Sequence, residues 1–172
     1  LFRSLETTVS GGQGLAAKGA RYRLDPLSTQ GSALEYIDWT GVANVNAAPK
    51  TMSFVNGPAL SLQDSLSQPA YQGNAVGTWR SDLSFATLTL TVTPAGVITG
   101  ETTGGCRYLG TLTARSDVTI YEATLEETCS YPQVAVVQFK GIGFISGSLN
   151  QLTLALETAD KTSGKVLYFI KQ

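Results

Sequence analysis

The chain has 172 residues, a net charge of −1 and 15% charged residues, well below the share of about 25% usual in globular proteins. This length allows one sizeable core, or one barrel-sized domain with a large extension. Lys and Arg are scattered singly, which excludes the basic footprint of a nucleic-acid-binding protein. No apolar run reaches the roughly 18 residues that span a bilayer, so we expect no transmembrane segment.

Residues 1–76 are expected to form an N-terminal extension or a small β lobe. Apolar patches at 36–45 and 52–55 predict two strands, and Gly-, Ser- and Gln-rich stretches around them are typical of turns and loops. Residues 60–66 fit a short helix as well as a strand. The pattern leaves open whether this part pairs with the remainder of the fold or stands apart.

From about residue 77 the apolar residues recur with a period of two, which indicates strands with one buried face. In residues 87–93, Leu88, Leu90 and Val92 alternate with threonines. The segment Thr93-Pro94-Ala95-Gly96 then predicts a turn, because Pro fixes φ and Gly accepts a positive φ. Residues 97–101 resume the extended pattern, which predicts a hairpin.

The remaining alternating segments extend this pattern to the end of the chain. Together with a strand beginning near Trp79 they make about eight; the further strands are expected at 107–113, 118–126, 134–145, 152–157 and 166–171. We predict an all-β fold in which residues 77–172 form an antiparallel up-and-down meander closed into a small barrel. Closure is preferred to a sandwich because it removes exposed strand edges.

The two cysteines are expected to form a disulfide. Cys106 and Cys129 lie at the open ends of a predicted hairpin that turns near 116–117. Opposed Cα atoms of antiparallel strands are about 4.5 to 5.5 Å apart, which is within disulfide reach. A disulfide would add roughly 3 kcal/mol in the entropic model and implies an oxidising compartment. The alternative is two reduced, buried thiols.

The composition argues against catalysis. The chain has no histidine, which excludes Ser-His-Asp and Cys-His arrangements and imidazole metal sites. We therefore expect no catalytic residue, no metal and no cofactor. Glu122 and Glu126 share one face of a predicted strand, where they could serve as the carboxylate pair of a glycan hydrolase. Their Thr and Tyr neighbours favour an outward acidic strip instead.

Aromatic side chains in the predicted barrel are candidates for binding a ligand. These candidates are Trp79, Tyr121, Phe139 and Tyr168. They could line a cavity inside the barrel. Packing in the hydrophobic core is the alternative reading of the same residues.

Residues 77–100 resemble the opening hairpin of the calycin barrels, the group that includes avidin and the lipocalins. The resemblance rests on a Gly-x-Trp motif at Gly77 and Trp79 and on the strand and turn that follow it through Gly100. The resemblance implies that Gly77 and Trp79 close one end of an eight-stranded barrel. The ligand positions of the biotin-binding members hold Ser81 and Thr102 here, and no Trp follows Trp79. Biotin is therefore not the expected ligand.

The segment 103–113, with the later Cys129, also resembles bacterial envelope lipoproteins. That resemblance implies secretion, a disulfide and no enzymatic activity. We expect an extracytoplasmic protein of the periplasm, the outer-membrane surface or the cell surface.

Two functions fit these expectations. One is a binding module for a small ligand or a protein partner. The other is a structural or adhesive subunit, a homo-oligomer in which strands of one copy add to the sheet of another.

Overall fold

We describe a computed structural model of the chain, which covers residues 3–10, 14–22, 32–44, 46, 51–55, 59–61, 68–83, 86–130 and 135–172. Three strands are described by their backbone pairing: β1 (Arg3–Ser10), β2 (Gly14–Tyr22) and most of β3 (Ser32–Asn44). The fold is all-β, as predicted, with one short helix in the described part of the chain.

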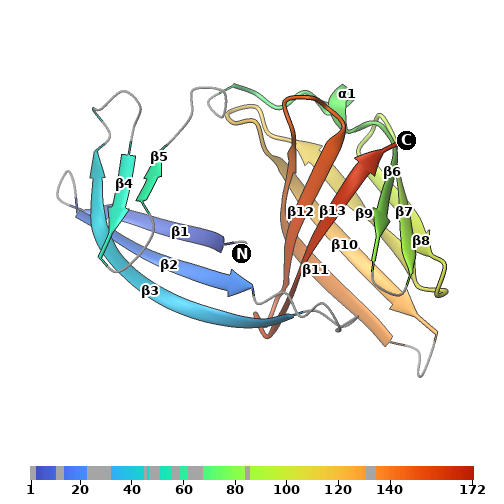
Figure 1. Ribbon diagram of the computed structural model, residues 1–172, viewed down its shortest axis with the longest axis horizontal. Coiled ribbons are helices and arrows are strands. Elements are labelled where there is room, and N and C mark those ends of the chain that lie inside the picture. The colour runs from blue at the N-terminus through green and yellow to red at the C-terminus, as the bar shows by residue number, and fades with distance from the viewer. Residues whose placement is uncertain are drawn as a thin grey trace.

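The C-terminal strands form a closed antiparallel barrel (Figure 1). Each strand pairs with the next along the chain, and the last strand pairs with the first through Ile170 with Arg80 and Lys171 with Trp79. The strands are β6 (Gly77–Asp82), β7 (Thr87–Val92), β8 (Val97–Thr102), β9 (Arg107–Ala114), β10 (Tyr121–Cys129), β11 (Ala135–Ile145), β12 (Gln151–Thr158) and β13 (Ser163–Lys171). The predicted eight-stranded up-and-down barrel is confirmed.

Strand alternation sorts side chains between the interior and the outer surface. In β7, Leu88 and Leu90 are fully buried while Thr91 is exposed. The turn after β7 is the predicted one: Gly96 has a φ of 79° and its amide donates to the Thr93 carbonyl at 2.8 Å. A positive φ is unstrained only for glycine, so this position fixes the hairpin.

Large side chains fill the barrel interior. Small eight-stranded barrels have room for little more than their own side chains. The most deeply buried ones are Trp79, Leu88, Leu90, Ile98, Leu112, Tyr121, Leu125, Leu152, Leu154, Leu156 and Phe169. The hydrophobic core therefore occupies the space that a calycin-like barrel could otherwise offer to a ligand.

The helix α1 (Gln72–Ala75) covers one end of the barrel, the end at which the C-terminus lies in Figure 1. The Trp79 indole N–H donates to the Ala75 carbonyl at 2.8 Å. Gln72 donates to the Leu112 carbonyl at 2.9 Å and accepts from the Ala114 amide at 2.8 Å. Sequence analysis did not predict this helix. The helix thus lies at the same end of the barrel as Trp79, for which the calycin resemblance implied a barrel-closing role.

A second antiparallel sheet precedes the barrel. It runs in the order β1, β2, β3, β4 (Thr51–Phe54) and β5 (Ala59–Ser61). The start of β3 also pairs with the start of β13, which joins the two sheets at the barrel end opposite α1. The strands expected at 36–45 and 52–55 correspond to β3 and β4. The short helix considered at 60–66 begins on a residue of β5, and 62–67 lie outside the described residues.

The division of the chain into residues 1–76 and 77–172 stays a prediction. No helix among the described residues is long and apolar enough to cross a membrane.

Candidate functional site

The barrel end opposite α1 carries the disulfide. Cys106 immediately precedes β9 and Cys129 ends β10, and the register that pairs Arg107 with Thr128 sets the two cysteines opposite each other. Their Cα atoms are 4.2 Å apart and their sulfurs are bonded, as predicted. The disulfide thus joins the ends of two adjacent barrel strands.

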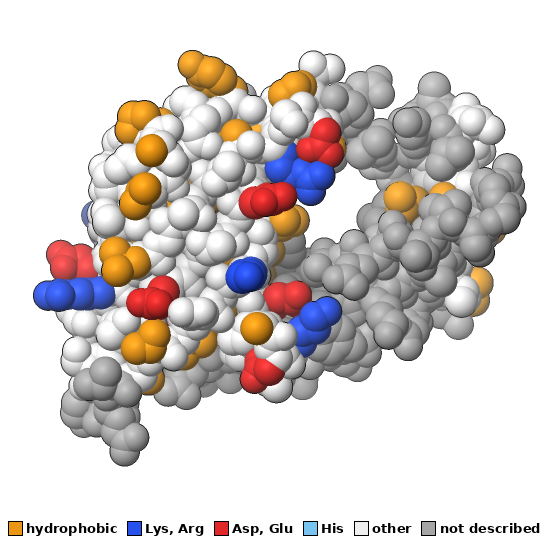
Figure 2. All heavy atoms as spheres, turned by 180° about the vertical axis from the view of Figure 1, so that it is seen from behind, with side chains coloured by type: hydrophobic (Ala, Val, Ile, Leu, Met, Phe, Trp, Pro, Cys, Tyr) orange, Lys and Arg blue, Asp and Glu red, His pale blue; other side chains and the backbone are white. Residues whose placement is uncertain are grey.

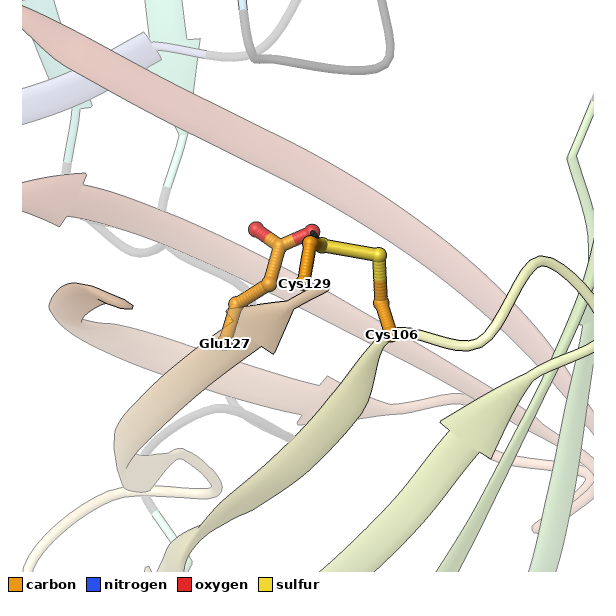
Figure 3. Close-up of side chains that lie close together, drawn as sticks. All are labelled: Cys106, Glu127 and Cys129. Atoms are coloured by element: carbon orange, nitrogen blue, oxygen red, sulfur yellow. Dashed lines mark hydrogen bonds between the residues drawn. A yellow bond between two sulfur atoms is a disulfide. The ribbon is translucent and has the colours of Figure 1, made fainter. Parts of the chain in front are cut away.

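A carboxylate lies beside the disulfide, inside the barrel (Figure 3). Glu127 is 8% exposed, and its Oε1 atom lies 3.6 Å from the Cys129 sulfur. The Tyr108 hydroxyl donates to this oxygen at 2.7 Å. The other carboxylate oxygen pairs with the Lys165 ammonium, whose Nζ lies 5.2 Å from the centre of the Phe139 ring. Both oxygens of this buried carboxylate therefore have a partner.

Burial raises the pKa of Tyr108, and the negative charge of Glu127 and the hydrogen bond to it raise it further. Tyr108 consequently remains a neutral hydrogen-bond donor throughout the physiological pH range. The tyrosine and the lysine together occupy both oxygens of the Glu127 carboxylate. The cluster of Tyr108, Glu127 and Lys165 is suited to stabilising this end of the barrel.

Cys106, Glu127 and Cys129 have ligand-type atoms within 4.8 Å of one another. The two sulfurs are bonded to each other, so neither is a thiolate. With the carboxylate also held by Lys165, the oxidised protein presents no set of free metal ligands at this place.

The aromatic residues singled out from the sequence lie in two places. Trp79, Tyr121 and Phe139 are buried inside the barrel, where they pack in the core. Tyr168 is 55% exposed on the outer face of β13. The structure therefore brings three of the four together and separates the fourth.

The two acidic residues on the outer face of β10 are accessible. The Glu122 side chain is 71% exposed and lies 4.0 Å from an Arg115 nitrogen, while Glu126 accepts a hydrogen bond from Gln138 at 3.3 Å. A glycosidase acid needs an apolar pocket that raises its pKa. Glu122 occupies a solvated surface instead.

The outer face of strands β7 to β10 has a hollow of about 650 Å³, which we call the β8 hollow. Two rows of outward side chains cross it. The register places Thr89, Glu101, Arg107 and Thr128 in one row, and Thr91, Thr99 and Leu109 in the other. The hollow thus offers hydroxyls, one carboxylate, one guanidinium and one aliphatic side chain.

A glycine allows the floor of the β8 hollow to form. Gly100 occupies an inward position of β8 between Ile98 and Thr102, and a Cβ there would lie 2.4 Å from the Leu90 side chain. The same Cβ would lie 2.4 Å from the Thr89 carbonyl oxygen. Without a side chain, the β8 backbone packs closely against β7 at this point. Gly100 lines the hollow.

The two charged side chains of the β8 hollow have no hydrogen-bond or ion-pair partner within the described part of the chain. Glu101 and Arg107 are directly paired across β8 and β9, both exposed, and within the described residues neither side chain has a hydrogen bond or an ion pair. On the face of the molecule shown in Figure 2, charged side chains of both signs are scattered over a mostly uncharged surface. The hollow therefore combines an available donor and an available acceptor in a concave place.

A second hollow, of about 460 Å³, is lined by Arg80, Asp82, Tyr168, Ile170 and Gln172. Its charged groups are already paired, because Arg80 lies 3.0 Å from Asp82. Asp82 also accepts from the Thr87 hydroxyl at 3.0 Å. This hollow has fewer free polar groups than the β8 hollow.

Sequence reasoning missed both the interior cluster and the β8 hollow. Glu127 is in phase with the inward residues Tyr121, Ala123 and Leu125, so alternation alone could have placed it inside the barrel. Glu101 ends the strand expected at 97–101 and Arg107 begins the one expected at 107–113, so the two residues could have been paired across the connection between these strands. The alternation of apolar and polar residues in the sequence gave no indication of a hollow at this place.

A scan against protein-family models, a search of curated proteins and a search of solved structures each found no significant match. The barrel architecture is that expected of a calycin-like protein.

Proposed function

We propose that this protein is a non-enzymatic binding module of an extracytoplasmic compartment, and that it holds its ligand in the β8 hollow. The observation that carries the proposal is that the cross-strand pair Glu101 and Arg107 lines the β8 hollow, with neither side chain engaged in a hydrogen bond or ion pair within the described part of the chain. Polar groups that converge in a concavity and lack intramolecular partners are typical of binding sites.

The packing of the barrel interior supports a binding site on the outer surface of the barrel. The aromatic residues first considered for a cavity are buried in a core cluster with leucines such as Leu125 and Leu154. The polar side chains inside the barrel bind one another: Glu127 accepts a hydrogen bond from Tyr108 and forms an ion pair with Lys165. An interior ligand would have to displace these contacts, whereas a ligand in the β8 hollow would displace only water.

The absence of histidine and the complete engagement of Glu127 support a binding role over a catalytic one. The disulfide between Cys106 and Cys129 supports an oxidising compartment such as the periplasm or the cell surface.

A second candidate is a structural subunit that assembles by strand addition. It is favoured by the sheet of β1 to β5, whose outer strands β1 and β5 each pair on one side only among the described residues. An unpaired strand edge can accept a strand of another copy. This candidate requires concentration-dependent polymers, whereas the binding module functions as a monomer.

Nuclear magnetic resonance can test the binding site. The oxidised, ¹⁵N-labelled protein is mixed with a neutral disaccharide, a dicarboxylate, a diamine and inorganic phosphate in turn. We expect one class to shift the amide signals of Gly100, Arg107 and Leu109 in a saturable way, and Thr99→Arg, which fills the β8 hollow, to abolish the shifts. Thr113→Arg, at an exposed position of the neighbouring strand β9 outside the hollow, is the matched control. Shifts confined to other surfaces would contradict the proposal.

A further inference from the structure

We infer that the ligand of the β8 hollow is a neutral saccharide. This inference rests on the proposed function and adds the chemical class of the ligand. It follows from the charge, the hydroxyl content and the shape of the hollow together.

The charges of the hollow favour a neutral ligand. Glu101 and Arg107 are directly opposed on adjacent strands, so their Cβ atoms are about 4.5 to 5.5 Å apart. An anion bound to the guanidinium would lie beside the carboxylate, and a cation bound to the carboxylate would lie beside the guanidinium. Like charges at such distances disfavour binding. A neutral ligand that both donates and accepts hydrogen bonds can use both groups.

Neighbouring hydroxyl groups have this double character. A guanidinium presents parallel N–H donors in a planar fork, and a carboxylate presents two acceptor oxygens. Vicinal hydroxyls can accept from the first and donate to the second. The threonines that flank the pair, Thr89 and Thr128, lie in the same cross-strand row and can each donate and accept.

The second row provides an apolar surface next to these polar groups. Leu109 is 56% exposed although it is aliphatic; it lies opposite Thr99 and two residues after Arg107, on the same face of β9. A pyranose ring has an apolar face of C–H groups between its hydroxyls, which can lie against such a side chain. The adjacent threonine methyl groups of Thr91 and Thr99 enlarge this surface.

The size and openness of the hollow fit part of a glycan chain. Its volume of about 650 Å³ lies within the range of roughly 300 to 1,000 Å³ found for small-molecule sites. It lies on the outside of a barrel wall, where strands β7 to β10 leave it accessible. An oligosaccharide attached to a larger polymer or a surface could therefore reach it.

A glycan array tests the inference. The labelled, oxidised protein is applied to immobilised neutral and acidic oligosaccharides, alongside Glu101→Gln, Arg107→Gln and the control Thr113→Ser. We expect binding to neutral glycans, an at least tenfold weaker signal for each of the first two variants, and a signal within twofold of wild type for the control. These exposed substitutions leave the buried core untouched.

Binding confined to acidic glycans, an absence of glycan binding, or neutral-glycan binding that both glutamine variants retain would overturn the inference. The magnetic resonance mapping described above separates this failure from that of the proposed function. If a charged compound shifts the Gly100 and Leu109 amides while no glycan binds, the hollow is a binding site for another class of ligand. If no compound shifts them, both proposals fall.

Discussion

Glu127 and Lys165 form an ion pair in which both side chains are about nine-tenths buried. Two buried charges offset each other's desolvation only as a pair, so removal of one partner is expected to cost about 3 to 5 kcal/mol. We predict a loss of this size in the free energy of unfolding for Glu127→Gln and for Lys165→Met. The double variant should lose less than either single variant. Denaturant unfolding measures all three, and single variants within 1 kcal/mol of wild type would show that the pair is not structural.

Tyr108 gives this cluster a pH dependence in the alkaline range. Its pKa is raised in the folded state, above a value of about 10 in the unfolded chain, chiefly by burial. The folded state therefore retains a proton that the unfolded state releases, and stability falls as the pH rises above about 10. Tyr121, whose pKa burial also raises, contributes in the same direction.

We predict that the free energy of unfolding of wild type decreases more steeply above pH 10 than that of Tyr108→Phe. Denaturant midpoints at a series of pH values give the two slopes. Tyrosinate absorbance of the folded protein should show the same number of ordinarily titrating tyrosines in both proteins. Loss of one such tyrosine from the titration of the variant would contradict the assignment.

At the scale of the strands, the packing of β8 against β7 depends on Gly100. A Cβ at this position would lie within 2.4 Å of Leu90 and of the Thr89 carbonyl, and one of them is backbone that cannot rotate away. We predict that Gly100→Ala destabilises the protein by about 1 to 3 kcal/mol and weakens ligand binding in the β8 hollow. Gly147→Ala is the control, since a Cβ there would meet nothing within 4 Å. Equal stability of the two variants in thermal unfolding would contradict this account.

The hairpin of β9 and β10 is held at its open end by the disulfide. Cys106 and Cys129 are 23 residues apart in sequence, and closing a loop of this length stabilises by about 3 kcal/mol in the entropic model. We predict a loss of roughly this size for the double variant Cys106→Ala with Cys129→Ala. Reduction of wild type should lower the unfolding midpoint, and the double variant should not respond to the reductant. A midpoint of wild type that is unaffected by complete reduction would refute this role.

How far the sequence predicts the strands depends on their alternation. The regular leucines and threonines of β7 and the turn at 93–96 located the hairpin of β7 and β8 closely. β2, with its glycines and alanines, has no such alternation, and it is specified by pairing with β1 and β3. β13 begins three residues before the strand expected at 166–171, because pairing with β12 and β3 overrides the turn propensity of Ser163 and Gly164.

The site was less predictable than the fold. Opposition of the two cysteines follows from the position of the hairpin turn, so the disulfide was accessible to sequence reasoning. Burial of Glu127 was also readable from its phase in β10. The β8 hollow combines the register of four strands with the close approach of Gly100 to Leu90, and a linear pattern contains neither quantity.

At the scale of the whole molecule, the two sheets differ in whether they have unpaired edge strands. The barrel has none, because β13 pairs with β6. Among the described residues, the sheet of β1 to β5 ends on β1 and β5, and it is paired with the barrel where β3 meets β13. The proposed binding function belongs to the barrel, whereas the second candidate, assembly by strand addition, would use the edges of the other sheet.

The measurement that tests the central claim most directly is the mass of the oxidised protein in solution. Light scattering over a wide concentration range is combined with native mass spectrometry of the same sample. A binding module predicts a monomer at all concentrations, with a retained small molecule whose mass disappears in Thr99→Arg and persists in Thr113→Arg. A ligand-free species that grows into polymers with concentration would contradict the account and favour assembly through strand edges.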